Sequence, residues 1–174
     1  MKIILVVAAV VIAVASLVVS NSLTRELADE EHNKMEIWAE AMRSLNTADE
    51  STDLNLVLKV INENNTIPVI VTGANGDVQI YRNVELSGQT LDDSLRQAKA
   101  ISERLLDEGR AIRIVLDENA PDGYINVCYD DSVMLKRLSA YPYIQLGVVM
   151  LFVVVAIFAL LTSKRAEQNK VWVG

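Results

Sequence analysis

The chain is poor in the side chains that most often do chemistry. Its 174 residues include one cysteine and one histidine. A single cysteine, Cys128, excludes an internal disulfide, and the strand-like run around it predicts a small core residue. His32 shares a helix face with Glu36, but structural zinc takes four ligands and the soft ligands are missing. We therefore expect a solvated His32 and no metal site.

Catalytic and nucleotide-binding patterns are also missing. The sequence holds no Gly-rich phosphate loop and no Ser–His–Asp set, so we expect no catalytic residue and no cofactor in this chain. Several acids gather near strand ends, but their spacing fits no EF-hand loop, and solvated turn and cap positions account for them. These acids are Asp117, Glu118, Asp122, Asp130 and Asp131.

Positive charge is scarce and unevenly placed. Lys and Arg number 16 against 23 Asp and Glu, which gives a net charge of −7. Residues 20–142 hold 12 of the basic and 22 of the acidic residues. So acidic a segment excludes nucleic acid as a partner, because phosphates need a basic surface. Its charge mainly provides solubility, and a specific cationic ligand is the less favoured interpretation.

Two long apolar runs bracket this acidic segment, at residues 3–19 and 143–161. At about 1.5 Å per helical residue, each run can cross most of a roughly 30 Å hydrocarbon layer. The sequence predicts transmembrane helices at residues 1–20 and 143–162. Cleavage of the first run as a signal peptide after Ala13-Val14-Ala15 is an alternative. Apolar residues continue past that site into a helical stretch, which favours a retained span.

Basic residues near the span ends predict the orientation. The stub at residues 163–174 carries Lys164, Arg165 and Lys170 against one acid, Glu167. Positive residues close to span ends stay in the cytoplasm. We therefore expect a protein of the inner (cytoplasmic) membrane with both termini in the cytoplasm and residues 21–142 outside.

The outer segment opens with a helical stalk at residues 21–46. Its first half is polar on all sides. Met35, Trp38, Met42 and Leu45 then recur at three- and four-residue steps and form one apolar stripe. This stripe packs on the outer domain, on the identical helix of a partner chain, or on both. The four residues are our candidates for the seam of a homodimer.

Residues 47–131 are expected to form one compact domain. Apolar positions at three- and four-residue steps predict helices, and β-branched or alternating runs predict strands. The expected helices lie at residues 53–63 and 90–108, and the expected strands at 67–72, 78–81, 112–116 and 124–129. A last helix begins at Asp131 or Ser132 and runs through a connector at residues 132–142 into the second apolar run.

Turn and cap residues mark the ends of these elements. Asn75-Gly76 between two apolar runs is a strong hairpin signal. Ser51 or Thr52 is expected to cap the first helix of the domain, Thr90 the second, and Gly109 suits the end of that second helix. Two hairpins joined by one helix predict an α+β fold: a small antiparallel sheet with helices on one face, flanked by two transmembrane helices.

The outer domain resembles the PAS-like (PDC or single-Cache) domains of extracellular bacterial sensors. The resemblance covers residues 51–131 and rests on element order and on the phrase Val69-Ile70-Val71-Thr72-Gly73-Ala74-Asn75-Gly76-Asp77. That phrase is similar to the first hairpin of many such domains. About four strands are expected here against the family's usual five, which implies a trimmed sheet.

The cytoplasmic stub carries a second resemblance. Arg165-Ala166-Glu167-Gln168-Asn169-Lys170-Val171-Trp172-Val173-Gly174 resembles the start of the dimerisation helix in membrane sensor histidine kinases of the Bacteroidetes type. The resemblance implies a homodimeric parent that binds ATP and Mg²⁺ in a kinase domain beyond this chain and phosphorylates a response regulator.

The same resemblance implies where a signal passes. It assigns transmission to Lys164, Arg165, Glu167 and Gln168 in the stub. Pro142 lies near the start of the second span, where it would bend the connecting helix. We add Pro142 to the transmission residues.

The sequence therefore predicts the input half of a two-component sensor histidine kinase. Two alternatives stay open: a receptor with another output, such as a chemoreceptor or a cyclase, and a two-span membrane-tethered periplasmic binding or scaffold protein without enzymatic output. The ligand is unknown. Arg82, at the end of the second strand, is a candidate contact for an anionic ligand, and an exposed strand-end arginine is the simpler interpretation.

Overall fold

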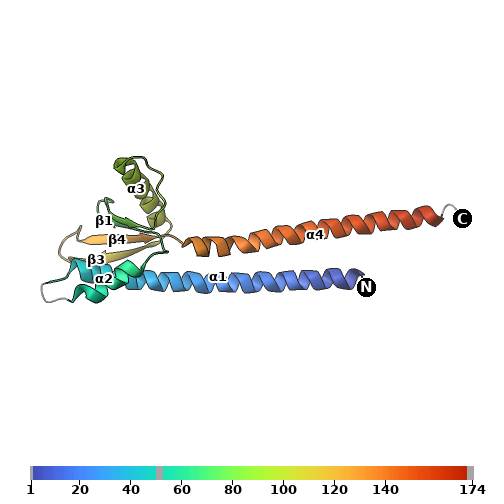
Figure 1. The fold of residues 1–174 in the computed structure, drawn as a ribbon, viewed down its shortest axis with the longest axis horizontal. Helices are drawn as coiled ribbons and strands as arrows, with labels where there is room; N and C mark the ends of the chain where they lie inside the picture. Colours follow the sequence, from blue (N-terminus) through green and yellow to red (C-terminus); the bar gives the residue numbers. More distant parts are fainter. Residues whose placement is uncertain (1, 50–52, 172–174) are drawn as a thin grey trace. The chain divides into compact units, whose positions relative to one another are not determined.

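The computed structural model describes residues 2–49 and 53–171, and the side chains of residues 7–49, 53–159 and 161–162. Helices and strands follow the predicted order (Figure 1). The helices are α1 (Lys2–Asn46), α2 (Leu54–Glu63), α3 (Leu91–Asp107) and α4 (Val133–Val171), and the strands are β1 (Val69–Gly73), β2 (Val78–Arg82), β3 (Ala111–Val115) and β4 (Tyr124–Tyr129).

The chain divides into two units. Leu27–Leu135 form one unit, called the sheet unit below. Met1–Glu26 and Lys136–Gly174 form the other, called the apolar helix unit. The sheet unit begins within the stalk, so the second half of that helix belongs to the compact domain.

The sheet unit is built on four antiparallel strands in the order β2-β1-β4-β3. The first hairpin turns at Asn75-Gly76, where Gly76 has φ +76° and its N–H donates to the Gly73 carbonyl. That positive φ is the reason for glycine at this position. The predicted α+β class, the single antiparallel sheet and both hairpins are confirmed.

One face of the sheet packs against α1. Met35, Trp38 and Met42 are buried there against β1, β3 and β4. Ile61 of α2 packs on the same cluster. The apolar stripe of the stalk therefore packs on its own domain, which was one of the expected arrangements, and a homodimer seam along α1 would need other faces of that helix.

The other face of the sheet packs against α3, so the prediction of helices on one face is wrong (Figure 1). Ile70 and Cys128 from the two central strands meet Ala98 and Leu105 of α3 there. The physical reason is visible in β1, where four consecutive residues, Val69–Thr72, are buried. A strand covered on both faces lacks alternation between apolar and polar residues.

Helix ends follow the predicted chemistry with one correction. Thr90 is the N-cap of α3 and its hydroxyl accepts from the Asp93 N–H, as predicted, and Gly109 follows the helix at φ +73°. The N-cap of α2 is Asp53, whose carboxylate accepts from the Asn55 N–H; Ser51 and Thr52 lie outside the described residues.

The apolar helix unit contains parts of the two long helices. By length and composition, α1 from Val7 and α4 up to Ala159 each contain a segment able to cross a membrane. Apolar side chains are exposed at consecutive positions of α4, including Met150, Leu151 and Phe152. Exposure on all sides of a helix is typical of a segment that meets lipid, whereas a soluble core helix hides at least one stripe.

Candidate functional site

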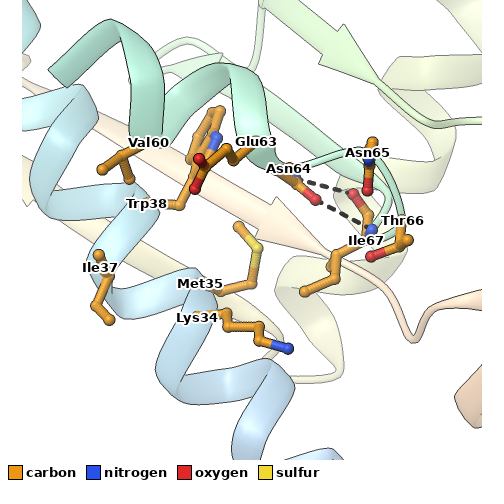
Figure 2. A pocket seen from close by; sticks show the side chains of 10 residues that line it. All are labelled: Lys34, Met35, Ile37, Trp38, Val60, Glu63, Asn64, Asn65, Thr66 and Ile67. Carbon is orange, nitrogen blue, oxygen red and sulfur yellow. Dashed lines mark hydrogen bonds between the residues drawn. The ribbon is translucent and has the colours of Figure 1, made fainter. Parts of the chain in front are cut away.

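A cavity of about 470 Å³ lies in the sheet unit between α1, α2 and the loop that joins α2 to β1 (Figure 2). Its volume falls within the range of small-molecule sites. Its apolar wall comes from α1, α2 and Ile67, which lies two residues before β1. Its polar lining comes from α1, from the end of α2 and from the loop. The lining residues are Lys34, Met35, Ile37, Trp38, Val60, Glu63, Asn64, Asn65, Thr66 and Ile67.

Hydrogen bonds fix the wall formed by α2. The Ile61 carbonyl accepts from the Trp38 indole N–H at 3.2 Å and from Nη1 of Arg82 at 2.6 Å. One carbonyl in the last turn of α2 is thus held from α1 and from β2 at once. Arg82 therefore ties β2 to α2, a structural role that neither sequence interpretation included.

The loop wall is held in the same way. The Asn64 side chain accepts from the Ile67 N–H and donates to the Ile67 carbonyl, both at 3.1 Å (Figure 2). Asn83, at φ +56°, donates its side-chain amide to the carbonyls of Asn64 and Ile67. Asparagine tolerates this left-handed backbone better than most residues. These bonds preform the cavity.

The charged groups at the cavity differ in how firmly they are paired. Nζ of Lys34 lies 2.8 Å from Oε1 of Glu30, an ion pair of good length. Oε1 of Glu63 lies 3.9 Å from Nζ of Lys59, at the limit of an ion pair. All four side chains are well exposed. The Glu63 carboxylate thus has more hydrogen-bonding capacity left than the Lys34 ammonium.

A second feature, the α1–α4 junction, consists of Glu31, His32, Tyr129 and Ser132. The Ser132 N–H donates to Oε2 of Glu31 at 3.0 Å, and the Ser132 hydroxyl also bonds this carboxylate. The same hydroxyl accepts from the Leu135 N–H, so Ser132 caps α4, as predicted. An anionic side chain from α1 at this helix N-terminus is favoured by the helix dipole.

His32 belongs to the same junction. Its Nδ1 lies 2.6 Å from the Tyr129 hydroxyl, and its Nε2 lies 3.5 Å from Glu36. The side chain is about half exposed, so His32 is in contact with solvent as expected but is also bonded to the end of β4. Burial raises the pKa of the Tyr129 phenol, an effect that Arg110 beside it partly offsets.

Arginines join the strand ends to the start of α4. Arg110 forms an ion pair with Asp131, which raises the pKa of the guanidinium. Nη2 of Arg104 on α3 lies 3.4 Å from Asp130. Two of the acids expected to be solvated turn and cap residues are therefore paired. The segment between β4 and α4 is therefore held by Arg110, the residue before β3, and by Arg104 of α3.

The predicted site residues come together only in part. Arg82 lines neither the cavity nor the junction, Met35 and Trp38 line the cavity, and Met42 lies in the core beside it. Leu45 packs at the edge of that core. Pro142 lies inside α4. The side chains of Lys164, Arg165, Glu167 and Gln168 lie outside the described residues.

Sequence reasoning missed Glu31 and Tyr129. Glu31 stands in a run of acids, and nothing in that run marks one carboxylate as the partner of a residue 101 positions later. Tyr129 was recognised as a strand end only. Ser132, by contrast, was found from its capping signal.

Other features of the sheet unit give no site. Within residues 2–49 and 53–171, no group of three or more His, Cys, Asp or Glu side chains is placed to hold a metal ion. An open hollow with polar lining lies at the start of α3, beside Gly88 and Arg96. Comparison with protein-family models, with curated proteins and with solved structures found no match for this chain.

Proposed function

We propose that the chain is the sensing and membrane part of a two-span receptor. The sheet unit lies outside the cell membrane as a PAS-like sensor, and α1 and α4 lead from it to the two spans. The receptor is a homodimer whose output is a sensor histidine kinase, with ATP and Mg²⁺ bound in a domain beyond Gly174 and a response regulator as its substrate.

The observation that supports this function best is the bond between Glu31 and Ser132. The carboxylate of α1 holds the first turn of α4 through the Ser132 N–H and hydroxyl. Each of these helices continues into an apolar segment long enough to span a membrane. A change in the sheet unit that alters this bond alters how the two helices leave the domain, which is what a transmembrane receptor requires.

The test replaces the unknown output with a measurable one. Residues 1–174 are joined to the cytoplasmic part of a histidine kinase that drives a reporter gene. We expect Glu31→Gln and Ser132→Ala to shift the basal reporter level by about 5-fold or more, because coupling energies of about 1–3 kcal/mol correspond to such factors.

The matched control is Glu30→Gln, one residue along α1, whose carboxylate pairs with Lys34 of the same helix and reaches no residue of α4 among the described side chains. It should leave the reporter level unchanged. Equal reporter levels in all three variants, with equal amounts of chimera in the membrane, would contradict the proposed transmission. If the variants changed the output of a chemoreceptor or cyclase chimera but not that of the kinase chimera, the receptor function would stand and the kinase output would be wrong.

A further inference from the structure

The cavity between α1 and α2 points to a ligand class. We propose that it binds a small organic cation: an ammonium group attached to an apolar aliphatic or aromatic body. This inference rests on the proposed sensing function and names the chemistry that the sensor recognises.

The apolar part of the ligand follows from the wall of the cavity. Met35, Trp38 and Ile67 are buried core residues that reach this wall, and Val60 of α2 adds to it. Figure 2 shows these side chains around one hollow, with Glu63 and the Asn65–Thr66 loop along its edge. A body of moderate size, held by burial of apolar surface, fits a volume of about 470 Å³.

The charge of the ligand follows from the polar edge. Glu63 lies at the C-terminal end of α2, where the helix dipole adds negative potential, and its only ion pair among the described residues is the 3.9 Å contact with Lys59. Asn65 and Thr66, in the loop after α2, offer further oxygen atoms to the same cavity. Carboxylate, amide and hydroxyl oxygens can each accept a hydrogen bond from an ammonium group, and the carboxylate alone among them carries the opposite charge.

An anionic ligand is disfavoured by the same geometry. Lys34 is the one cation in the lining, and Glu30 already holds it at 2.8 Å. Residues 27–135 contain 9 Lys and Arg against 21 Asp and Glu, a net charge of −12, which repels anions and attracts cations over the whole unit. An anion would have to break the Lys34–Glu30 pair against that field.

The binding test uses the full chain in lipid nanodiscs and the fluorescence of Trp38. The chain has two tryptophans, Trp38 and Trp172, so Trp172→Phe leaves the cavity tryptophan as the single reporter. The probes are 2-phenylethylammonium, its neutral counterpart 2-phenylethanol, the anion 3-phenylpropionate and the zwitterion phenylalanine. We expect a saturable change in emission with the ammonium probe and at least tenfold weaker binding of the other three.

A charge variant then locates the site. Glu63→Gln should weaken binding of the ammonium probe about tenfold or more, the factor expected when a hydrogen bond to a charged group is lost. Glu103→Gln, an exposed acid on α3 against the opposite face of the sheet, is the matched control and should leave the affinity unchanged.

Three results would overturn the inference: no saturable binding of 2-phenylethylammonium, equal or tighter binding of the neutral, anionic or zwitterionic probe, or equal weakening by both variants. Failure here is separable from failure of the receptor function. A reporter that still responds to Glu31→Gln in the chimera, together with no binding of the ammonium probe, rejects the ligand class and keeps the receptor.

Discussion

Cys128 shows at the residue scale how burial decides reactivity. Its side chain lies in the core between the sheet and α3. Burial raises the pKa of the Cys128 thiol from 9.0 to about 11, and the Thr72 hydroxyl on the same face of the sheet partly offsets this rise. Thr72 Oγ1 has no hydrogen bond of good geometry among the described residues. The thiol is therefore a core group, as the sequence predicted, and it is protonated at neutral pH.

We predict that Cys128 resists alkylation while the protein is folded. With a pKa of about 11 against 9.0, its thiolate fraction at pH 8 is about 100-fold below that of an exposed cysteine, and the thiolate is the nucleophile. The measurement is the rate of modification by iodoacetamide, with Asn119→Cys in a Cys128→Ala background as the exposed control. Both cysteines should react equally fast in denaturant. Fast labelling of Cys128 in the folded protein would contradict its burial.

The same pKa fixes the sign of a pH effect on stability. The folded state keeps the Cys128 proton up to about pH 11, while the unfolded state loses it above about pH 9. The unfolded state therefore binds fewer protons in this range, and stability falls as the pH rises through it. Well below pH 9 both states keep the proton, and the thiol contributes no pH dependence.

At the scale of elements, the second half of α1 has one side in the core of the sheet unit and another side exposed to solvent. It supplies Met35, Trp38 and Met42 to the core of the sheet unit. Its side away from the sheet exposes Ile37. The domain is thus incomplete without the stalk, and a displacement of α1 changes the packing of the sheet directly.

We predict that Met35→Ala destabilises the sheet unit by about 2–5 kcal/mol, the usual range for emptying a core position. Met35 is 1% exposed, whereas Ile37 is 61% exposed on the same helix. Ile37→Ala is therefore the matched control, with an expected loss below about 1 kcal/mol. Urea unfolding of both variants in detergent measures the difference. Equal losses would place the apolar stripe of α1 outside the core.

The sequence predicted the ends of helices and the turns well, because these features depend on residues adjacent in the chain. The Asn75-Gly76 turn, the Thr90 cap and Gly109 each depend on a few adjacent residues, and each is found where the sequence placed it. The second covered face of the sheet was missed, although the continuous apolar run in β1 indicated it. The site was not predictable in this way, because Glu31–Ser132 and Arg82–Ile61 join residues that are distant in the chain.

At the scale of the whole molecule, composition separates two environments. The acidic, hydrogen-bonded sheet unit carries a net charge of −12, while α4 exposes Met150, Leu151 and Phe152 on successive sides. Water suits the first surface and hydrocarbon the second. The proposal that both spans cross the membrane, with the sheet unit outside, follows from this separation and from the basic residues near the end of α4.

The most direct test of that proposal is the accessibility of single cysteines in intact cells. In a Cys128→Ala background, Asn119→Cys lies in the exposed loop between β3 and β4, and Lys164→Cys lies beyond the second apolar run. A maleimide that cannot cross membranes is added before or after permeabilisation. The account predicts labelling of Asn119→Cys in intact cells and of Lys164→Cys only after permeabilisation. Labelling of both positions in intact cells, or protection of Asn119→Cys, would contradict it.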